Sequence, residues 1–202
     1  MTRAEFAARL KNACAAVTAA EAELTEIDSK FGDADHGLTM AKIAGAISEA
    51  VDAAEGGIQS MLDDAAMAVM TLNGGSAVPL WNTWLVGLQE EAPEGEEIDV
   101  AGLKAIFAKA LEELEDMSGA KVGDKTMMDA LIPASEAVAA YTGDSADELF
   151  DAAAQAAAQG AEATKQYVSK FGRAKSYGTK TIGTPDAGAV SMSWFFQGLA
   201  RE

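Results

Sequence analysis

In the stretch Met40-Ala41-Lys42-Ile43-Ala44-Gly45-Ala46-Ile47-Ser48-Glu49-Ala50-Val51, the large apolar residues recur at steps of three and four. This spacing places them on one face of an α-helix, where they can pack against other helices. The same spacing recurs at Leu103, Phe107, Leu111 and Leu114. No region alternates apolar and polar residues for long enough to predict a β-strand, so the chain is predicted to be all-α.

Eight helices are predicted, because turn-forming residues and helix caps interrupt the helical pattern. Asp99 and Asp124 are predicted N-caps, and Ser145-Ala146-Asp147-Glu148 has the pattern of a capping box. The alanine-rich run 151–163 is interpreted as a closely packed helix rather than as low-complexity sequence. The predicted helices cover residues 2–26, 38–55, 58–72, 78–91, 99–117, 125–141, 146–170 and 187–200.

The composition indicates one domain and excludes several classes of partner. No proline-rich or serine-rich linker divides residues 1–202, which are therefore predicted to form a single domain. The formal net charge of −17 argues against sequence-independent binding to nucleic acid or to an anionic membrane surface, although a basic partner protein fits it. Neither a leader peptide nor an apolar run long enough to cross a membrane is found. With Cys14 as the only cysteine, no disulfide framework is expected and a cytoplasmic location fits.

Three carboxylates and the single histidine of the chain crowd one short turn, which ends at Gly37. Asp28, Asp33 and Asp35 would repel one another unless a cation neutralised them, so the turn is predicted to bind a divalent metal. Carboxylate oxygens with room left for phosphate oxygens and water favour Mg²⁺. The alternative is a solvated acidic turn in which Asp35 caps the next helix.

Calcium and zinc fit this turn less well. An EF-hand loop that began at Asp33 would need glycine and glutamate where the chain has Leu38 and Ala44. A tetrahedral zinc site would need more nitrogen and sulfur ligands than His36 and Cys14 can supply. Because Mg²⁺ is commonly bound together with phosphate, the metal prediction directs attention to loops that can hold phosphate.

Four glycine-containing loops are expected to meet at one end of the bundle if successive helices alternate in direction. These are the loops after the first, third, fifth and seventh predicted helices. They contain Asp33, Gly74-Gly75-Ser76, Gly123-Asp124-Lys125-Thr126, and Gly172-Arg173 with Asp186.

The second of these loops, Gly74-Gly75-Ser76-Ala77, has the features of a phosphate cradle. Its glycines let the backbone approach a ligand, and free N–H groups at the start of a helix attract anions. The alternative is a plain turn in which Pro79 is the first residue of the helix.

The third and fourth loops also allow two interpretations each. The segment 123–126 is either part of a binding loop or simply a capped helix start, and Met127 either packs in the core or lies against a flat base. Arg173 and Lys180 flank Tyr177, and they either neutralise phosphate or lie as solvated surface charges.

The ordered motifs resemble the nucleotide-binding L subunit of bacterial dihydroxyacetone kinases. The resemblance runs from about residue 20 to the C-terminus. It rests on Ile27-Asp28 with Gly32-Asp33-Ala34-Asp35-His36-Gly37, Gly74-Gly75-Ser76 before Pro79-Leu80, Gly123-Asp124-Lys125-Thr126-Met127-Met128-Asp129-Ala130, Gly172-Arg173-Ala174, and Ile182-Gly183 before Asp186-Ala187-Gly188-Ala189.

The resemblance implies an eight-helix antiparallel up-and-down barrel with the nucleotide site at one end. Asp28, Asp33 and Asp35 would hold two Mg²⁺ ions that bridge the phosphates of ADP or ATP. The resemblance also implies that His36, Gly75, Ser76 and Ala77 lie along the phosphates and that Thr126 and Met127 lie near the adenine. Asp186 and Gly188 would border the nucleotide. Arg173 would contact phosphate as the catalytic residue.

The resemblance also implies that the chain is half of an active site. In that family a separate K subunit or domain holds the ketose covalently through a histidine. The phosphoryl donor is either exchangeable ATP or a retained ADP that a phosphocarrier subunit of the phosphotransferase system rephosphorylates. This chain departs from the family at Val78-Pro79-Leu80-Trp81-Asn82, where Gly-Pro-Leu-Tyr-Gly is common, at Ala187, where proline is frequent, and at Lys180, where some members have arginine.

Two other functions remain open at this point. The nucleotide-binding domain of a fatty-acid kinase resembles the same fold but normally carries Asp-Gly-Asp-Thr-Gly-Thr-Asn in its acidic turn. A protein of a different class, a non-enzymatic sensor whose nucleotide state a transcription regulator reads, would use the same binding site without turnover.

Overall fold

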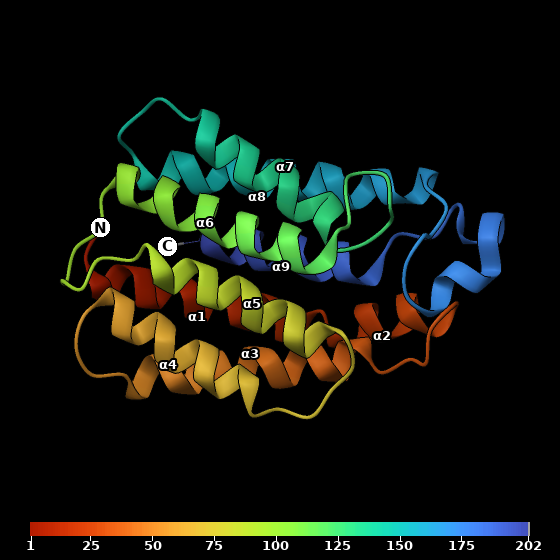
Figure 1. The fold of residues 1–202 in the computed structure, drawn as a ribbon, viewed down its shortest axis with the longest axis horizontal. Coiled ribbons are helices and arrows are strands. Elements are labelled where there is room, and N and C mark those ends of the chain that lie inside the picture. Colours follow the sequence, from red (N-terminus) through yellow and green to blue (C-terminus); the bar gives the residue numbers. More distant parts are fainter. Residues whose placement is uncertain (202) are drawn as a thin grey trace.

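The computed structural model describes residues 1–201, which form nine α-helices and two short 3₁₀ segments (Figure 1). Thr2 and Glu97 form an isolated β-bridge, but no strand is present in this part of the chain, so the all-α prediction is confirmed. The elements are α1 (Arg3–Ala19), α2 (Glu21–Ser29), α3 (His36–Ala53), α4 (Ile58–Met70), α5 (Ala77–Glu90), α6 (Val100–Ser118), α7 (Met128–Ala140), α8 (Ala146–Ala163), η1 (Thr164–Gln166), η2 (Arg173–Thr181) and α9 (Ala187–Leu199).

The helices form a closed up-and-down barrel. From α3 onward each helix packs against its successor, and α9 returns to pack against α1, which also packs against α3. The predicted first helix is in fact two, because Ala20, with φ −87° and ψ 3°, leaves helical geometry between α1 and α2. Since α2 continues in the direction of α1, the two form one broken rod, and eight rods make up the barrel as predicted (Figure 1).

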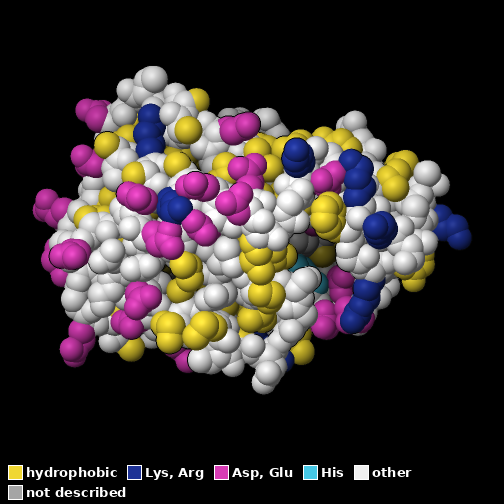
Figure 2. Space-filling model, viewed as in Figure 1, with side chains coloured by type: hydrophobic (Ala, Val, Ile, Leu, Met, Phe, Trp, Pro, Cys, Tyr) yellow, Lys and Arg dark blue, Asp and Glu magenta, His cyan; other side chains and the backbone are white. Residues whose placement is uncertain are grey.

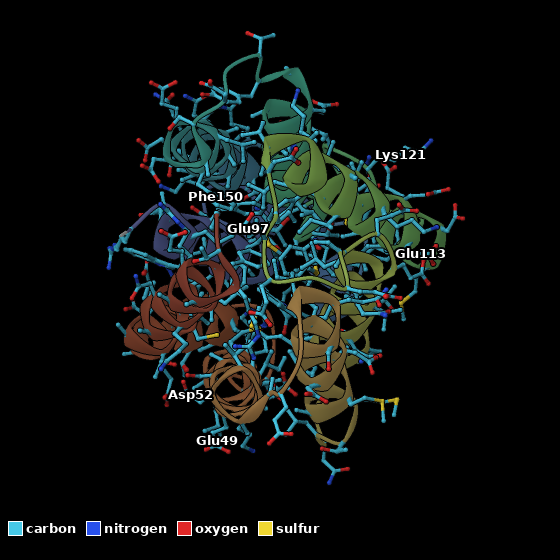
Figure 3. All side chains as sticks on the ribbon, turned by 90° about the vertical axis from the view of Figure 1, so that its left-hand side faces the viewer. Glu49, Asp52, Glu97, Glu113, Lys121 and Phe150 are labelled. Carbon is cyan, nitrogen blue, oxygen red and sulfur yellow. The ribbon has the colours of Figure 1, made fainter. Side chains whose placement is uncertain are left out.

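Aromatic side chains fill the interior of the barrel. Trp84 on α5 makes edge-on contact with Phe195 on α9 at a ring-centroid distance of 5.3 Å, and its ring centroid is 6.1 Å from that of Phe107 on α6. Phe150 on α8 extends the cluster through Phe107. Viewed from the left of Figure 1, the helices surround an interior filled with side chains, whereas the acidic residues Glu49 and Asp52 point outward (Figure 3).

Two departures from the family motif belong to this packing and not to a ligand site. Trp81 is buried in the barrel, with its ring centroid 5.2 Å from that of Phe195. The side-chain amide of Asn82 donates to the carbonyl of Ala66 at 2.7 Å and so joins α5 to α4. The bulk of these residues therefore lies between helices.

Arg9 joins the first and last helices of the barrel, α1 and α9. Its guanidinium donates to the carbonyl of Leu199 at 2.8 Å, pairs with Asp147 at the start of α8, and lies 5.3 Å from the ring centre of Phe150. The side chain of Arg9 is buried. Its polar and aromatic contacts compensate for the cost of removing the charge from water. One residue thus fastens three helices together.

Several predicted caps need correction or refinement. The Asp99 cap is confirmed, because its carboxylate accepts the N–H of Gly102 at 2.8 Å. The Asp124 cap was wrong: α7 begins only at Met128, and Asp124 instead pairs with Lys170 at 2.6 Å. Ser145 accepts the N–H of Glu148, but the carboxylate of Glu148 accepts from the hydroxyl of Tyr141 and does not complete a capping box.

Two further helix ends differ from the predictions. The helix α8 ends at Ala163 and not near residue 170, because the chain turns through η1. Pro79 is the third residue of α5, so it lies in the first turn but is not the first helical residue. The earlier end of α8 lengthens the connection between α8 and α9, which spans residues 164–186.

The four loops that contain the candidate site lie at one end of the barrel, at the right of Figure 1. They are the connections 30–35, 71–76, 119–127 and 164–186. The opposite end carries the other connections and both termini, as alternating helix directions predict. Within residues 1–201, no helix combines the length and apolarity that crossing a membrane requires.

Candidate functional site

Three carboxylates converge at the junction of α2 and α3. Asp28 lies in the last turn of α2, and Asp33 and Asp35 lie in the turn that follows. One carboxylate oxygen from each lies within 4.8 Å of the other two. Gly32 makes this approach possible, because a β-carbon at that position would collide with the carboxylate of Asp28. The turn therefore gathers negative charge that a cation would stabilise.

The donor atoms of this cluster fit Mg²⁺. All three are hard carboxylate oxygens, which suit this ion, and the spacing leaves room for oxygens of a ligand or of water. The Oδ2 atom of Asp28 is buried and has no hydrogen-bond partner, a costly arrangement for a carboxylate unless a cation contacts it. Asp35 stands at the N-cap position of α3 but accepts no capping hydrogen bond, so the geometry does not support the alternative of a capping residue.

The segment η2 lies against the same turn. Arg173, its first residue, forms an ion pair with Asp33. The rings of Tyr177 and Phe31 pack with their centroids 5.2 Å apart. A guanidinium group is thus held beside the carboxylate cluster, within reach of any anion that a metal would attract there.

This segment carries much of the positive charge of an acidic protein. Residues 164–185 include five basic residues and no acidic one, in a chain with a net charge of −17. Figure 2 shows Lys and Arg gathered at the right-hand end, next to a hollow in the surface, whereas Asp and Glu outnumber them over the rest of this face. The local field at this end therefore favours an anionic ligand.

His36 connects the acidic turn to the start of α9. Its Nε2 atom lies 3.2 Å from the hydroxyl of Ser191, which in turn donates to the carbonyl of Gly188 at 2.9 Å. Burial lowers the pKa of His36 and favours the neutral ring, although Asp28 opposes this. The contact brings the predicted residues His36 and Gly188 into one region.

The glycine-rich loop before α5 lies against the helix that follows the acidic turn. A β-carbon on Gly74 would be 3.1 Å from the methyl group of Thr39 on α3, so this loop packs closely against that side chain. Gly75 and Ser76 are exposed, and Ala77 begins α5. Backbone N–H groups in the first turn of α5 are therefore available at the same end of the barrel as the carboxylates.

The loop before α7 meets the segment before α9. A β-carbon on Gly188 would lie 3.3 Å from the backbone nitrogen of Met127 and 3.1 Å from Oδ2 of Asp186. Met127 is almost fully buried, which fits the interpretation that it packs in the core. Thr126 precedes it and is partly exposed. The residues predicted to border the base thus lie together, from loops far apart in the sequence.

Asp129 shapes this loop and was missed as a site residue at the sequence level. Its carboxylate accepts the N–H groups of Gly123 at 2.6 Å and of Thr126 at 2.7 Å. An Asp three residues after Thr126, in the first turn of a helix, is a pattern that predicts such a local bond. Lys125 was missed as well, because a lysine in a loop is ordinarily solvated.

Asp186 caps α9, and its carboxyl group has a raised pKa. It is the N-cap of α9, since its carboxylate accepts the N–H of Ala189 at 2.8 Å. Desolvation raises the pKa of the Asp186 carboxyl to about 7, and the nearby carboxylate of Asp129 adds to this effect. Carboxyl groups with pKa values raised by burial and by a neighbouring carboxylate are common at functional sites.

Replacing Asp186 with Asn is expected to change how stability depends on pH. The folded protein holds this proton more tightly than the unfolded chain, so ionisation destabilises the fold progressively between pH 3.8 and about 7. The Asn variant keeps the cap but lacks the ionisation. Its free energy of unfolding, relative to wild type, should rise by about 2 kcal/mol across that window, after allowance for partial exposure. Chemical denaturation at both ends of the window tests this, and a constant difference between the two proteins would contradict it.

The chain matches the family model of the DAK2 domain over residues 30–201 and therefore belongs to the DAK2 domain family. It is 36% identical over 204 residues to the L-erythrulose kinase of Pectobacterium atrosepticum, a match that covers 96% of this chain and 34% of that protein. It is 29% identical over 191 residues to the PEP-dependent dihydroxyacetone kinase ADP-binding subunit DhaL of Escherichia coli, covering 93% of this chain and 91% of that subunit. The resemblance to L subunits is thus confirmed as homology.

The fold has also been seen in a solved structure. The crystal structure of the dihydroxyacetone kinase from C. freundii in complex with AMP-PNP and Mg²⁺ superposes with a TM-score of 0.73 at 24% sequence identity. The match covers 98% of this chain and 33% of that one. The chain therefore spans about a third of the length of several of its relatives, although it spans most of the length of the ADP-binding subunits.

Proposed function

We propose that this chain is a Mg-nucleotide-binding phosphotransferase domain that presents a phosphoryl group to a small ketose held by a partner. The observation that carries the proposal is the cluster of Asp28, Asp33 and Asp35 beside Arg173, with a buried oxygen of Asp28 left without a partner. Carboxylates, a glycine-bearing helix start and a guanidinium are the parts that phosphoryl transfer uses for positioning and charge neutralisation. The relatives named as kinases support the same reaction class.

Each group of residues has its own part in this proposal. Asp28, Asp33 and Asp35 would hold Mg²⁺, two ions in the fullest form of the proposal, and bound Mg²⁺ would supply charge neutralisation at the phosphate oxygens. The loop of Gly75, Ser76 and Ala77, together with His36, would line the path of the phosphates. The base lies toward Thr126, Met127, Asp186 and Gly188.

Arg173 is proposed as the residue that contacts the transferred phosphate. It lies at the start of a segment whose first residue follows Gly172, where φ is 60°, a conformation that favours glycine. From this position the guanidinium already reaches Asp33. Its planar pair of donors matches two phosphate oxygens at once.

Arg173→Ala is expected to weaken Mg-ADP binding or transfer by about 1.5–3 kcal/mol, because a charge-assisted hydrogen bond is lost. Arg173→Lys should recover only part of this, since the two-pronged geometry is absent. Lys175→Ala, an exposed residue on the same segment, is the matched control for the change in net charge. Calorimetry measures Mg-ADP binding, and a kinase assay measures transfer. If Arg173→Ala and Lys175→Ala behave alike, Arg173 is a solvated surface charge that does not contact phosphate.

The ketose and the phosphoryl donor are the finer parts of the proposal. The chain has a single histidine, His36, which lies at the nucleotide end, so no second histidine can hold a ketose covalently. A separate K subunit or domain is therefore proposed to hold dihydroxyacetone or a related ketose such as erythrulose. The donor is either exchangeable ATP or a retained ADP that a phosphocarrier protein recharges.

Turnover with and without a partner tests the proposed function. The purified chain, given Mg-ATP and either ketose, is expected to show no phosphorylation until a K subunit is added. A protein purified with tightly held ADP, active only with a phosphocarrier, would identify the second donor mode. Ketose phosphorylation by the chain alone, absent in an Asp33→Asn control, would contradict the half-site proposal. Nucleotide binding without turnover with any K subunit would instead favour the sensor.

A further inference from the structure

Lys125 is a buried charged residue in the loop before α7. Only 4% of its surface is exposed, although Gly123 and Asp124 beside it are partly exposed. Its backbone has φ 63°, in the left-handed region, which is unfavourable for a residue with a β-carbon. A strained backbone around a buried charge persists only where the contacts of the side chain compensate for it.

The contacts of Lys125 join three separate segments. Its Nζ atom donates to the carbonyl of Thr164 at 2.5 Å and to the carbonyl of Thr184 at 2.5 Å. Thr164 follows the last residue of α8, and Thr184 precedes the start of α9. A single ammonium group therefore ties the loop before α7 to both ends of the 164–186 connection.

Thr164 extends this tie toward the site. It is completely buried, its hydroxyl donates to the carbonyl of Ala161 at 2.5 Å, and the same oxygen accepts the N–H of Asp186 at 2.9 Å. Asp186 in turn caps α9, whose first turn contains Gly188. The position of Gly188 thus depends on the segment that Lys125 holds.

The charge at Lys125 is balanced locally and not by solvent. Desolvation lowers the pKa of Lys125, whereas the carboxylates of Asp186 and Asp129 oppose this and favour the ammonium. Asp129 also binds the loop backbone on either side of Lys125. Asp129 therefore holds the backbone of the loop, and Lys125 holds the loop against the 164–186 connection.

We propose that Lys125 is a positioning residue for the nucleotide base: its ammonium draws the two ends of the 164–186 connection onto the loop before α7 and so sets the gap between Met127 and Gly188. The inference rests on the proposed function, because that gap borders the base only if the site binds a nucleotide. Lys125 itself does not touch the nucleotide in this proposal. It acts through Thr164, Thr184 and Asp186, which lie on the side of the site that is proposed to hold the base.

Two substitutions separate the tie from the backbone conformation. Lys125→Met keeps the length of the side chain but removes the ammonium, and Lys125→Gly removes the tie and also relieves the left-handed strain. Lys121→Met, an exposed lysine four residues earlier in the same loop, is the control for the loss of one positive charge. Far-UV circular dichroism and thermal unfolding establish that each variant is folded.

The measurement compares a ligand that has a base with one that lacks it. Calorimetry with Mg-ADP and with Mg-pyrophosphate reports on the base side and on the phosphate side of the site. Both Lys125 variants are expected to bind Mg-ADP at least tenfold more weakly than wild type, with Mg-pyrophosphate affinity changed less than twofold. Lys121→Met should match wild type with both ligands.

Two results would overturn this inference. One is a Lys125→Gly protein that binds Mg-ADP within twofold of wild type. The other is an equal loss of Mg-ADP and Mg-pyrophosphate affinity, which general loosening or unfolding would produce. Failure of the wild-type protein to bind Mg-ADP would instead contradict the proposed function itself.

Discussion

Asp33→Asn and Asp35→Asn are each expected to lower the affinity for Mg-ADP by more than a hundredfold, while the helical fold remains intact. Each carboxylate in the cluster is within 4.8 Å of the others, so each would contact the same cations. Removing one partner of a desolvated charge pair costs on the order of 3–5 kcal/mol, which corresponds to this loss. Calorimetry with ADP and Mg²⁺ measures it. Asp63→Asn, an exposed aspartate on α4, is the control, and unchanged affinity in both site variants would refute the metal assignment.

The same substitutions are expected to differ in their effect on stability without metal. Asp35→Asn removes one of three mutually repelling charges and should leave the thermal midpoint unchanged or raise it. Asp33→Asn also breaks the ion pair with Arg173, so its thermal midpoint should rise less than that of Asp35→Asn. Thermal unfolding in the presence of a chelator distinguishes the two. A large loss of stability in Asp35→Asn would show that this carboxylate supports the fold and not a cation.

Trp84→Ala is expected to destabilise the protein by about 3–5 kcal/mol, because truncating a buried aromatic leaves a large cavity. Trp84 is fully buried, and its ring contacts aromatic side chains from α5, α6 and α9. Its indole N–H has no hydrogen-bond partner, so burial of that group already has a cost.

Trp84→Phe is the matched comparison. It keeps an aromatic ring and removes the unpaired N–H, so its cost should be well below that of the alanine variant. Guanidinium denaturation followed by far-UV circular dichroism measures both free energies of unfolding. An alanine variant within about 1 kcal/mol of wild type would contradict the view that these aromatics hold the barrel together.

Most of the fold could be predicted from the sequence, because the helical spacing of large apolar residues directly reports which face each helix buries. Ile43 and Ile47 on α3, for example, lie in the core as their spacing predicts. The convergence of four loops could be predicted from the number and order of the helices, because helices that alternate in direction place every second loop at the same end of the bundle. The acidic turn could be recognised because clustered carboxylates repel one another unless a cation neutralises them.

Other features left no readable signal. The break at Ala20 involves no glycine or proline, so nothing in the pattern separates α1 from α2. Lys125 looks like an ordinary loop lysine, and its burial depends on the carbonyls of Thr164 and Thr184, which only the closed barrel brings near. Asp124 fits a cap by residue type, but the left-handed residue after it delays the start of α7. Of these three features, the burial of Lys125 is the one that contacts between distant segments decide.

The closure of α9 onto α1 places both termini at the end of the barrel away from the nucleotide loops (Figure 1). The distance between the two ends is about the length of α6, whose 19 residues extend for about 28 Å. A linker fused to either terminus must therefore run along the whole barrel before the module it carries can face the loops. In artificial fusions with a ketose-holding module, linkers much shorter than this should give no turnover, and attachment of the chain to a sensor surface through either terminus should leave the opposite end free to meet a partner from solution.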